Sequence, residues 1–139
     1  CGASNGVTFK NPDEKLCDLS KCDGGVTEVH VKQAGKLGCR HLILGKNGLV
    51  ALPAGLGALA ALTTLSCAEN KLAELPEDIA ALAATLTHLD ASDNKLRKLP
   101  EGIGALTALR VLALYKNELA TLPDAVGRLV NLEDLNVFN

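Results

Sequence analysis

Residues 86–108, LTHLDASDNKLRKLPEGIGALTA, decide the fold. In the first half of this stretch, apolar and polar residues alternate around Leu89, which predicts a short strand with one buried face. In the second half, Leu99, Ile103 and Leu106 are three or four residues apart. That spacing suits a helical or 3₁₀ turn that turns one apolar face inward. The stretch therefore predicts one strand followed by one short helical segment.

The same pattern occurs four times in succession and begins a fifth time at Leu132. The four units span residues 39–61, 62–85, 86–108 and 109–131. Because one unit cannot bury its own leucines, neighbouring units must stack in register. We therefore predict a parallel sheet with strands about 4.8 Å apart, and short helical segments on the opposite side. Residues 132–139 fill the first eight positions of the fifth unit, so we expect the sequence to be part of a longer array.

Two further positions of the unit recur. Position 9 is asparagine in all four units, and a proline opens each second half, where its missing N–H costs nothing. The residues are Asn47, Asn70, Asn94 and Asn117, and Pro53, Pro76, Pro100 and Pro123. An asparagine amide can satisfy backbone groups of its own turn and of the adjacent one. We therefore assign the asparagines a structural role.

This pattern resembles the leucine-rich repeat family. The resemblance covers residues 39–139, and the 23-residue unit with "LPxxIxxL" is most similar to the plant intracellular Ras-group-related type. Cys39, Cys67 and Ala91 replace framework leucines. The resemblance implies an α/β solenoid, a horseshoe with parallel strands on its concave face and helical or 3₁₀ turns on its convex face. It also implies binding of other proteins, without naming a partner.

The composition excludes several functions. A net charge of −2 offers nothing to attract nucleic acid or an anionic membrane. No apolar run approaches the roughly 20 residues of a membrane-spanning helix. The sequence has no N-x-S/T glycosylation site, which favours an intracellular, cytoplasmic location, with a secreted or surface-anchored protein as the alternative.

The first 38 residues show no full unit, and we interpret residues 1–38 as an N-terminal cap and residues 39–139 as the repeats. Residues 26–31, VTEVHV, imitate the strand half of the unit but lack its asparagine. We expect them to form a cap strand that covers the end of the core, running antiparallel to the first repeat strand.

The cysteines leave alternatives open. Cys39 and Cys67 occupy framework positions and are expected to be buried thiols. Cys1, Cys17 and Cys22 can be free thiols, can include a Cys17–Cys22 disulfide within CDLSKC, or can hold a metal. A lone C-x4-C without a second pair is weak evidence for zinc, so no metal and no cofactor is predicted.

Positions 3, 5, 7 and 8 of each unit should face the concave side. Tyr115 and Phe138 occupy position 7 of adjacent units, and exposed aromatic residues are preferred anchors at interfaces. Acidic residues also gather there, with lysines at intervals, which would suit a basic or mixed partner surface. The predicted partner-binding residues are Glu69, His88, Asp90, Asp93, Tyr115, Lys116, Asp134 and Phe138.

No catalytic site is predicted. His41 and His88 lie two strands apart, about 10 Å at standard strand spacing, and no water-excluding pocket surrounds them. The favoured function is a non-enzymatic scaffold or regulatory module that binds a protein. The alternatives are a subunit of a larger complex, docked by the alanine-rich convex or N-terminal face, and a secreted or surface-anchored recognition domain.

Overall fold

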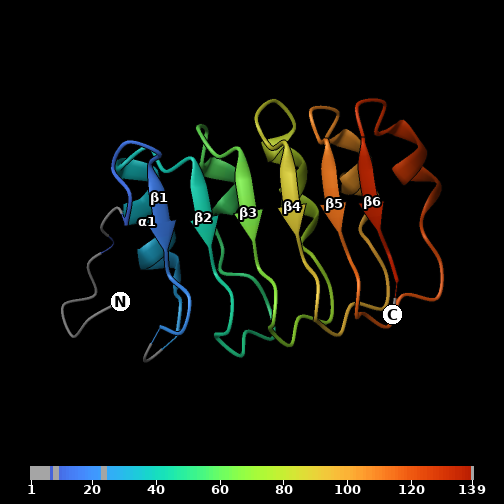
Figure 1. The fold of residues 1–139 in the computed structure, drawn as a ribbon, viewed down its shortest axis with the longest axis horizontal. Helices are drawn as coiled ribbons and strands as arrows, with labels where there is room; N and C mark the ends of the chain where they lie inside the picture. Colours follow the sequence, from blue (N-terminus) through green and yellow to red (C-terminus); the bar gives the residue numbers. More distant parts are fainter. Residues whose placement is uncertain (1–6, 8–9, 23–24, 139) are drawn as a thin grey trace.

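The computed structural model describes residues 7, 10–22 and 25–138. Six short strands form one parallel sheet in chain order (Figure 1). They are β1 (Leu16–Asp18), β2 (His41–Ile43), β3 (Thr64–Ser66), β4 (His88–Asp90), β5 (Val111–Ala113) and β6 (Asp134–Asn136). The remaining elements are α1 (Glu28–Lys36) and the 3₁₀ helices η1 (Leu56–Ala58), η2 (Glu77–Leu82), η3 (Glu101–Ala105) and η4 (Asp124–Arg128).

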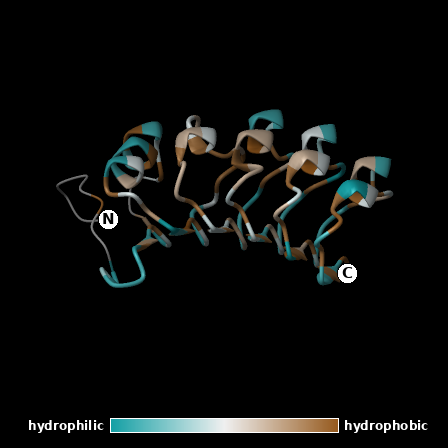
Figure 2. Ribbon diagram, turned by 90° about the horizontal axis from the view of Figure 1, so that it is seen from above, coloured by the Kyte–Doolittle hydropathy of each residue, from teal (hydrophilic) through white to brown (hydrophobic). Residues whose placement is uncertain are grey.

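The strands and the helices form two layers of a gently curved solenoid, with the sheet on the inner side of the curve (Figure 2). The central residue of each strand from β2 to β5 points between the layers and is fully buried, as Leu42, Leu65, Leu89 and Leu112 show. The residues on either side of it point to the concave face. This arrangement is the predicted α/β solenoid with parallel strands.

The asparagines connect the units. Asn94 Nδ2 donates to the carbonyl oxygens of Ala91 in its own unit and Cys67 in the preceding unit, at 3.1 Å each. Its Oδ1 accepts from the backbone N–H of Leu72 at 2.9 Å. Asn47, Asn70 and Asn117 make equivalent bonds. Each amide thus satisfies backbone groups that the stacking of units removes from water.

Glycines let successive 3₁₀ helices approach closely. A Cβ atom on Gly104 of η3 would lie 2.8 Å from the Ala125 carbonyl oxygen in η4. A Cβ atom on Gly57 of η1 would lie 2.9 Å from Ala81 Cβ in η2. Pro76, Pro100 and Pro123 immediately precede η2, η3 and η4 and have an extended conformation. Each proline is therefore the N-cap of its helix and does not belong to the first turn.

The prediction of an antiparallel cap strand at residues 26–31 was wrong. These residues enter α1, and the added strand is β1, which runs parallel to β2. Thr27 begins the helix with a capping box in which His30 Nδ1 accepts from the Thr27 backbone N–H at 3.1 Å. Val31 and Ala34 then face the core on consecutive turns. The valines that imitated a strand do not share one helix face, because Val29 is 54% exposed whereas Val31 is buried.

The Cys17–Cys22 disulfide, one of the alternatives that the sequence left open, is not formed. Cys17, Cys39 and Cys67 are buried free thiols, whereas Cys22 is disulfide-bonded to none of these three. Cys17 is the central residue of β1, so its side chain points into the core. Burial raises its pKa to about 12, with a smaller contribution from the neighbouring Cys39 thiol. Cys1 lies outside the described residues.

Candidate functional site

A shallow groove of about 580 Å³ runs across the concave face, over the carboxyl ends of strands β1 to β5. We call it the concave groove. It is lined by Ser20, Lys21, Ile43, Gly45, Lys46, Ser66, Ala68, Glu69, Asp90, Ser92, Asp93, Tyr115 and Lys116. Five successive repeats therefore contribute to one continuous surface.

The floor of the concave groove consists of small side chains. Gly45 and Ala68 occupy position 7 of neighbouring repeats, and Ser66 is the last residue of β3. A Cβ atom on Gly45 would lie 3.2 Å from the Ala68 carbonyl oxygen, so the backbones are closely packed at this point. Small floor residues leave the surface open to an approaching chain.

The rim is built from one charged residue at position 8 of each of the first five repeats. Lys21, Lys46, Glu69, Asp93 and Lys116 all have left-handed backbone conformations, with φ between 50° and 60°. Such a conformation is unfavourable for a residue with a side chain, by roughly 1 kcal/mol, and persists only when the surroundings fix it. Inter-repeat hydrogen bonds provide this constraint: Asp93 N donates to Tyr115 O at 2.9 Å, and Lys21, Lys46, Glu69 and Lys116 donate likewise to the next repeat.

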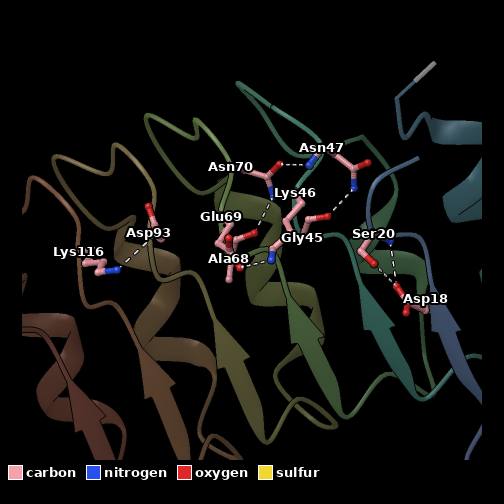
Figure 3. Close-up of polar contacts among 10 residues, drawn as sticks. All are labelled: Asp18, Ser20, Gly45, Lys46, Asn47, Ala68, Glu69, Asn70, Asp93 and Lys116. Carbon is pink, nitrogen blue, oxygen red and sulfur yellow. Dashed lines mark hydrogen bonds and ion pairs between the residues drawn. The ribbon is translucent and has the colours of Figure 1, made fainter. Parts of the chain in front are cut away.

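Ion pairs join charges along this rim (Figure 3). Lys46 Nζ lies 3.2 Å from Glu69 Oε1, and Lys116 Nζ lies 3.7 Å from Asp93 Oδ2. All four side chains are about half exposed or more, so each pair contributes little to stability and can be exchanged for a partner's charge.

Two carboxylates of the inner face have serine partners. Asp90 Oδ1 accepts from Ser92 Oγ at 2.6 Å and from its backbone N–H at 3.0 Å. Asp18 makes the same contacts with Ser20, and it also pairs with Lys10 Nζ at 2.6 Å. The hydrogen bond from Lys10, followed by that from Ser20, lowers the pKa of Asp18 to about 2.

The structure brings five of the eight predicted partner-binding residues into the concave groove. These are Glu69, Asp90, Asp93, Tyr115 and Lys116. His88 lies outside it, with Nδ1 2.8 Å from Thr87 Oγ1. Asp134 and Phe138 belong to the last repeat, where Phe138 is 79% exposed. A hydrogen bond of 2.8 Å from Lys116 N to Phe138 O joins the two neighbouring backbone segments that carry Tyr115 and Phe138.

Sequence reasoning missed the contribution of the first repeat, Ser20 and Lys21. The signal was present in the spacing of Cys17, Leu19 and Cys22, which equals that of Leu42, Leu44 and Asn47 in the next repeat. Cys22 stands where the later repeats have asparagine, and its backbone N–H donates to Asn47 Oδ1 at 2.7 Å.

Other kinds of site find no support in the described part of the chain. Residues 7, 10–22 and 25–138 contain no group of three or more His, Cys, Asp or Glu side chains arranged to hold a metal ion. In the same residues, no helix has the length and apolar character needed to cross a membrane.

Comparison with known proteins decides the family. The family described as leucine-rich repeat region matches residues 15–139. The chain belongs to the leucine-rich repeat family. The match begins before β1, which agrees with the place of that strand in the sheet. The comparisons do not show the predicted similarity to the plant Ras-group-related type. No curated protein matches this leucine-rich repeat chain.

Solved structures of other leucine-rich repeat proteins are similar. A protein of Leptospira interrogans shares 33% sequence identity over 94% of this chain, with a TM-score of 0.80. This chain spans only about a third of the length of that protein (33%). The BIR2 ectodomain of Arabidopsis thaliana shares 25% identity over 68% of this chain and 52% of its own, with a TM-score of 0.57. The Arabidopsis receptor kinase HAESA, solved in complex with the peptide hormone IDA and the co-receptor SERK1, shares 24% identity over 81% of this chain and 20% of its own. Its TM-score is 0.70, which shows a shared fold.

Proposed function

We propose that this chain is a non-enzymatic protein-interaction module that binds a protein partner through its concave face. The observation that carries the proposal is the concave groove, because it offers a continuous, open surface across five repeats with exposed charges and an aromatic ring. The leucine-rich repeat fold supports it, since the similar receptor HAESA was solved with a peptide hormone and a co-receptor.

Tyr115 and Phe138 are the proposed anchors. Tyr115 is 38% exposed at one end of the concave groove, and Phe138 follows β6 on the adjacent backbone. Large aromatic side chains contribute much of the affinity at protein interfaces. Exposed aromatic rings at two successive repeats are therefore a natural place for a partner's apolar side chain.

Docking through the convex face is the second candidate. Ala58, Ala60, Ala61 and Ala81 are exposed on or beside η1 and η2, so small side chains face outward there. Such a surface permits close approach of another chain, as in a subunit of a larger complex.

Comparative capture from cells distinguishes the two faces. The 139-residue protein, a Tyr115→Ala/Phe138→Ala variant and an Ala58→Arg variant are used as baits of equal concentration. If the partner binds the concave face, the wild type and the Ala58→Arg variant should capture the same protein. The double variant should fail to capture it. Proteins lost only with Ala58→Arg would overturn the proposal in favour of convex docking.

The cellular compartment is a separate proposal. Disulfides form and persist in oxidising compartments, so the bonded state of Cys22 favours the secreted or surface-anchored alternative over the intracellular one. Alkylation of the unreduced, denatured protein followed by mass measurement tests this: five alkylated cysteines would contradict it.

A further inference from the structure

We infer that the concave groove binds an extended segment of its protein partner, with an acidic side chain over the Lys21–Lys46 end and a basic side chain over the Glu69–Asp93 centre. This inference rests on the proposed function and adds the chemistry of the partner. It follows from the order of charges along the rim.

The charges of the rim are grouped, not alternating. From β1 to β5 the position-8 residues read Lys21, Lys46, Glu69, Asp93 and Lys116. Two lysines therefore lie side by side at one end, and two carboxylates lie side by side in the centre. Like charges on neighbouring strands repel one another, so each group gains from an opposite charge supplied by a partner.

The basic end has an unused charge. Among the ion pairs of the described residues, none includes Lys21, whereas Lys46 pairs with Glu69 on the side away from β1. Lys21 is exposed and lines the concave groove. An acidic side chain placed here would pair with Lys21 without breaking any ion pair of the chain.

The centre has an excess of negative charge. Asp90 adds a third carboxylate beside Glu69 and Asp93, while a single lysine pairs with each of the two rim carboxylates. The small Ser66 and Ala68 leave space in front of these carboxylates. A lysine or arginine side chain of the partner fits this position, and the Tyr115 ring beyond it offers an apolar or cation–π contact.

The spacing of the strands indicates the spacing of the partner's charges. Strands lie about 4.8 Å apart, so the lysine end and the carboxylate centre are separated by two intervals, or about 10 Å. An extended chain advances about 3.4 Å per residue. The acidic and basic residues of the segment should therefore lie about two to four positions apart.

Selection from a displayed library of random twelve-residue segments, using the whole 139-residue protein as target, tests the inference. We expect selected segments to carry an acidic and a basic residue at this separation, with an apolar residue beyond the basic one. A synthetic peptide of the most frequent selected sequence should bind Lys21→Glu at least fivefold more weakly, and Asp93→Lys at least fivefold more weakly. Neither change should strain the backbone, because Glu69 and Lys116 already adopt the same left-handed conformation at position 8 of their own repeats.

Lys71→Glu is the matched control. Lys71 is exposed and does not line the concave groove, and Lys71→Glu makes the same change of net charge as Lys21→Glu. Its affinity for the peptide should stay within twofold of the wild type, and circular dichroism should show that all three variants are folded.

The possible failures are distinguishable. Selected segments that depend on Tyr115 and Phe138 but ignore the two charge reversals would overturn the charge order and leave the proposed function standing. Selected segments whose affinity changes neither with the charge reversals nor with the Tyr115 and Phe138 substitutions would overturn the inference and the concave-face proposal together. A library that yields no binder would overturn the inference of an extended segment.

Discussion

The Asn70 side chain crosses from its own repeat to the preceding one, where its Nδ2 donates to the Leu44 carbonyl oxygen at 3.1 Å. The same amide holds its own turn through Cys67 O at 2.9 Å, and its Oδ1 accepts from the backbone N–H groups of Asn47 and Leu49. One buried side chain therefore closes two turns and joins two repeats. Stability should depend strongly on these asparagines, and less on surface polar contacts.

Asn94→Ala tests this dependence. The change leaves the Leu72 N–H without its acceptor and the Ala91 and Cys67 carbonyl oxygens without one of their donors, in a buried setting. Each unsatisfied buried group costs about 1–3 kcal/mol, so we expect a loss of about 2–4 kcal/mol in the free energy of unfolding. Urea denaturation measures it. Asn131→Ala is the control, because Asn131 is exposed and its side chain donates to Thr107 O, and it should cost less than about 1 kcal/mol.

Gly104→Ala should destabilise the stack of 3₁₀ helices. The new Cβ would lie 2.8 Å from Ala125 O and 3.0 Å from Ala125 Cβ, and backbone atoms cannot move aside as a flexible side chain can. We expect a loss of about 1–3 kcal/mol, by thermal or urea unfolding. Gly127 occupies the same position of the next repeat, with nothing within 4 Å of its added Cβ. Equal losses for Gly104→Ala and Gly127→Ala would show that close helix packing is not the cause.

The three free cysteines should be unreactive in the folded protein. Burial raises the pKa of Cys67 and of Cys17 to about 12 and also raises that of Cys39, and all three are at most 1% exposed. At pH 8 almost no thiolate is present, and iodoacetamide reacts with the thiolate. Mass spectrometry should find these residues unlabelled in the native state and fully labelled in denaturant. Rapid native labelling of Cys17 alone would mean that the first repeat opens.

Asp18 should make stability depend on acid pH. Its pKa in the folded state is about 2, below the ordinary value of 3.8. The stabilisation is therefore fully present above about pH 4 and is lost as the pH falls through about 2, because protonation breaks the pair with Lys10. Lys10→Ala should raise the Asp18 pKa toward its ordinary value, as measured by an NMR titration of the side-chain carboxyl. An unchanged titration would show that Ser20 alone holds the carboxylate.

The concave groove was predictable in part. The strand register follows from the alternation around Leu42, Leu65, Leu89 and Leu112, so the side of the sheet on which Tyr115 and the acidic residues lie could be read directly. The end of the groove at Ser20 and Lys21 was missed, although the spacing of Cys17, Leu19 and Cys22 marks it, because residues 26–31 offered a more convincing strand pattern than residues 16–18. The valines of residues 26–31 are spaced as in the strand half of the unit, yet α1 buries Val31 and exposes Val29, and only contacts with distant residues decide for the helix.

The sequence by itself determined the repeat, the parallel register and the buried asparagines, because each of these depends on residues that recur at a fixed interval. The tertiary structure alone decided that α1 and not a strand follows β1, and that Cys17 is a buried free thiol that is not bonded to Cys22. It also decided which charges pair along the rim. These features involve single residues whose conformation is set by neighbours far along the chain, and local pattern holds no information about such contacts.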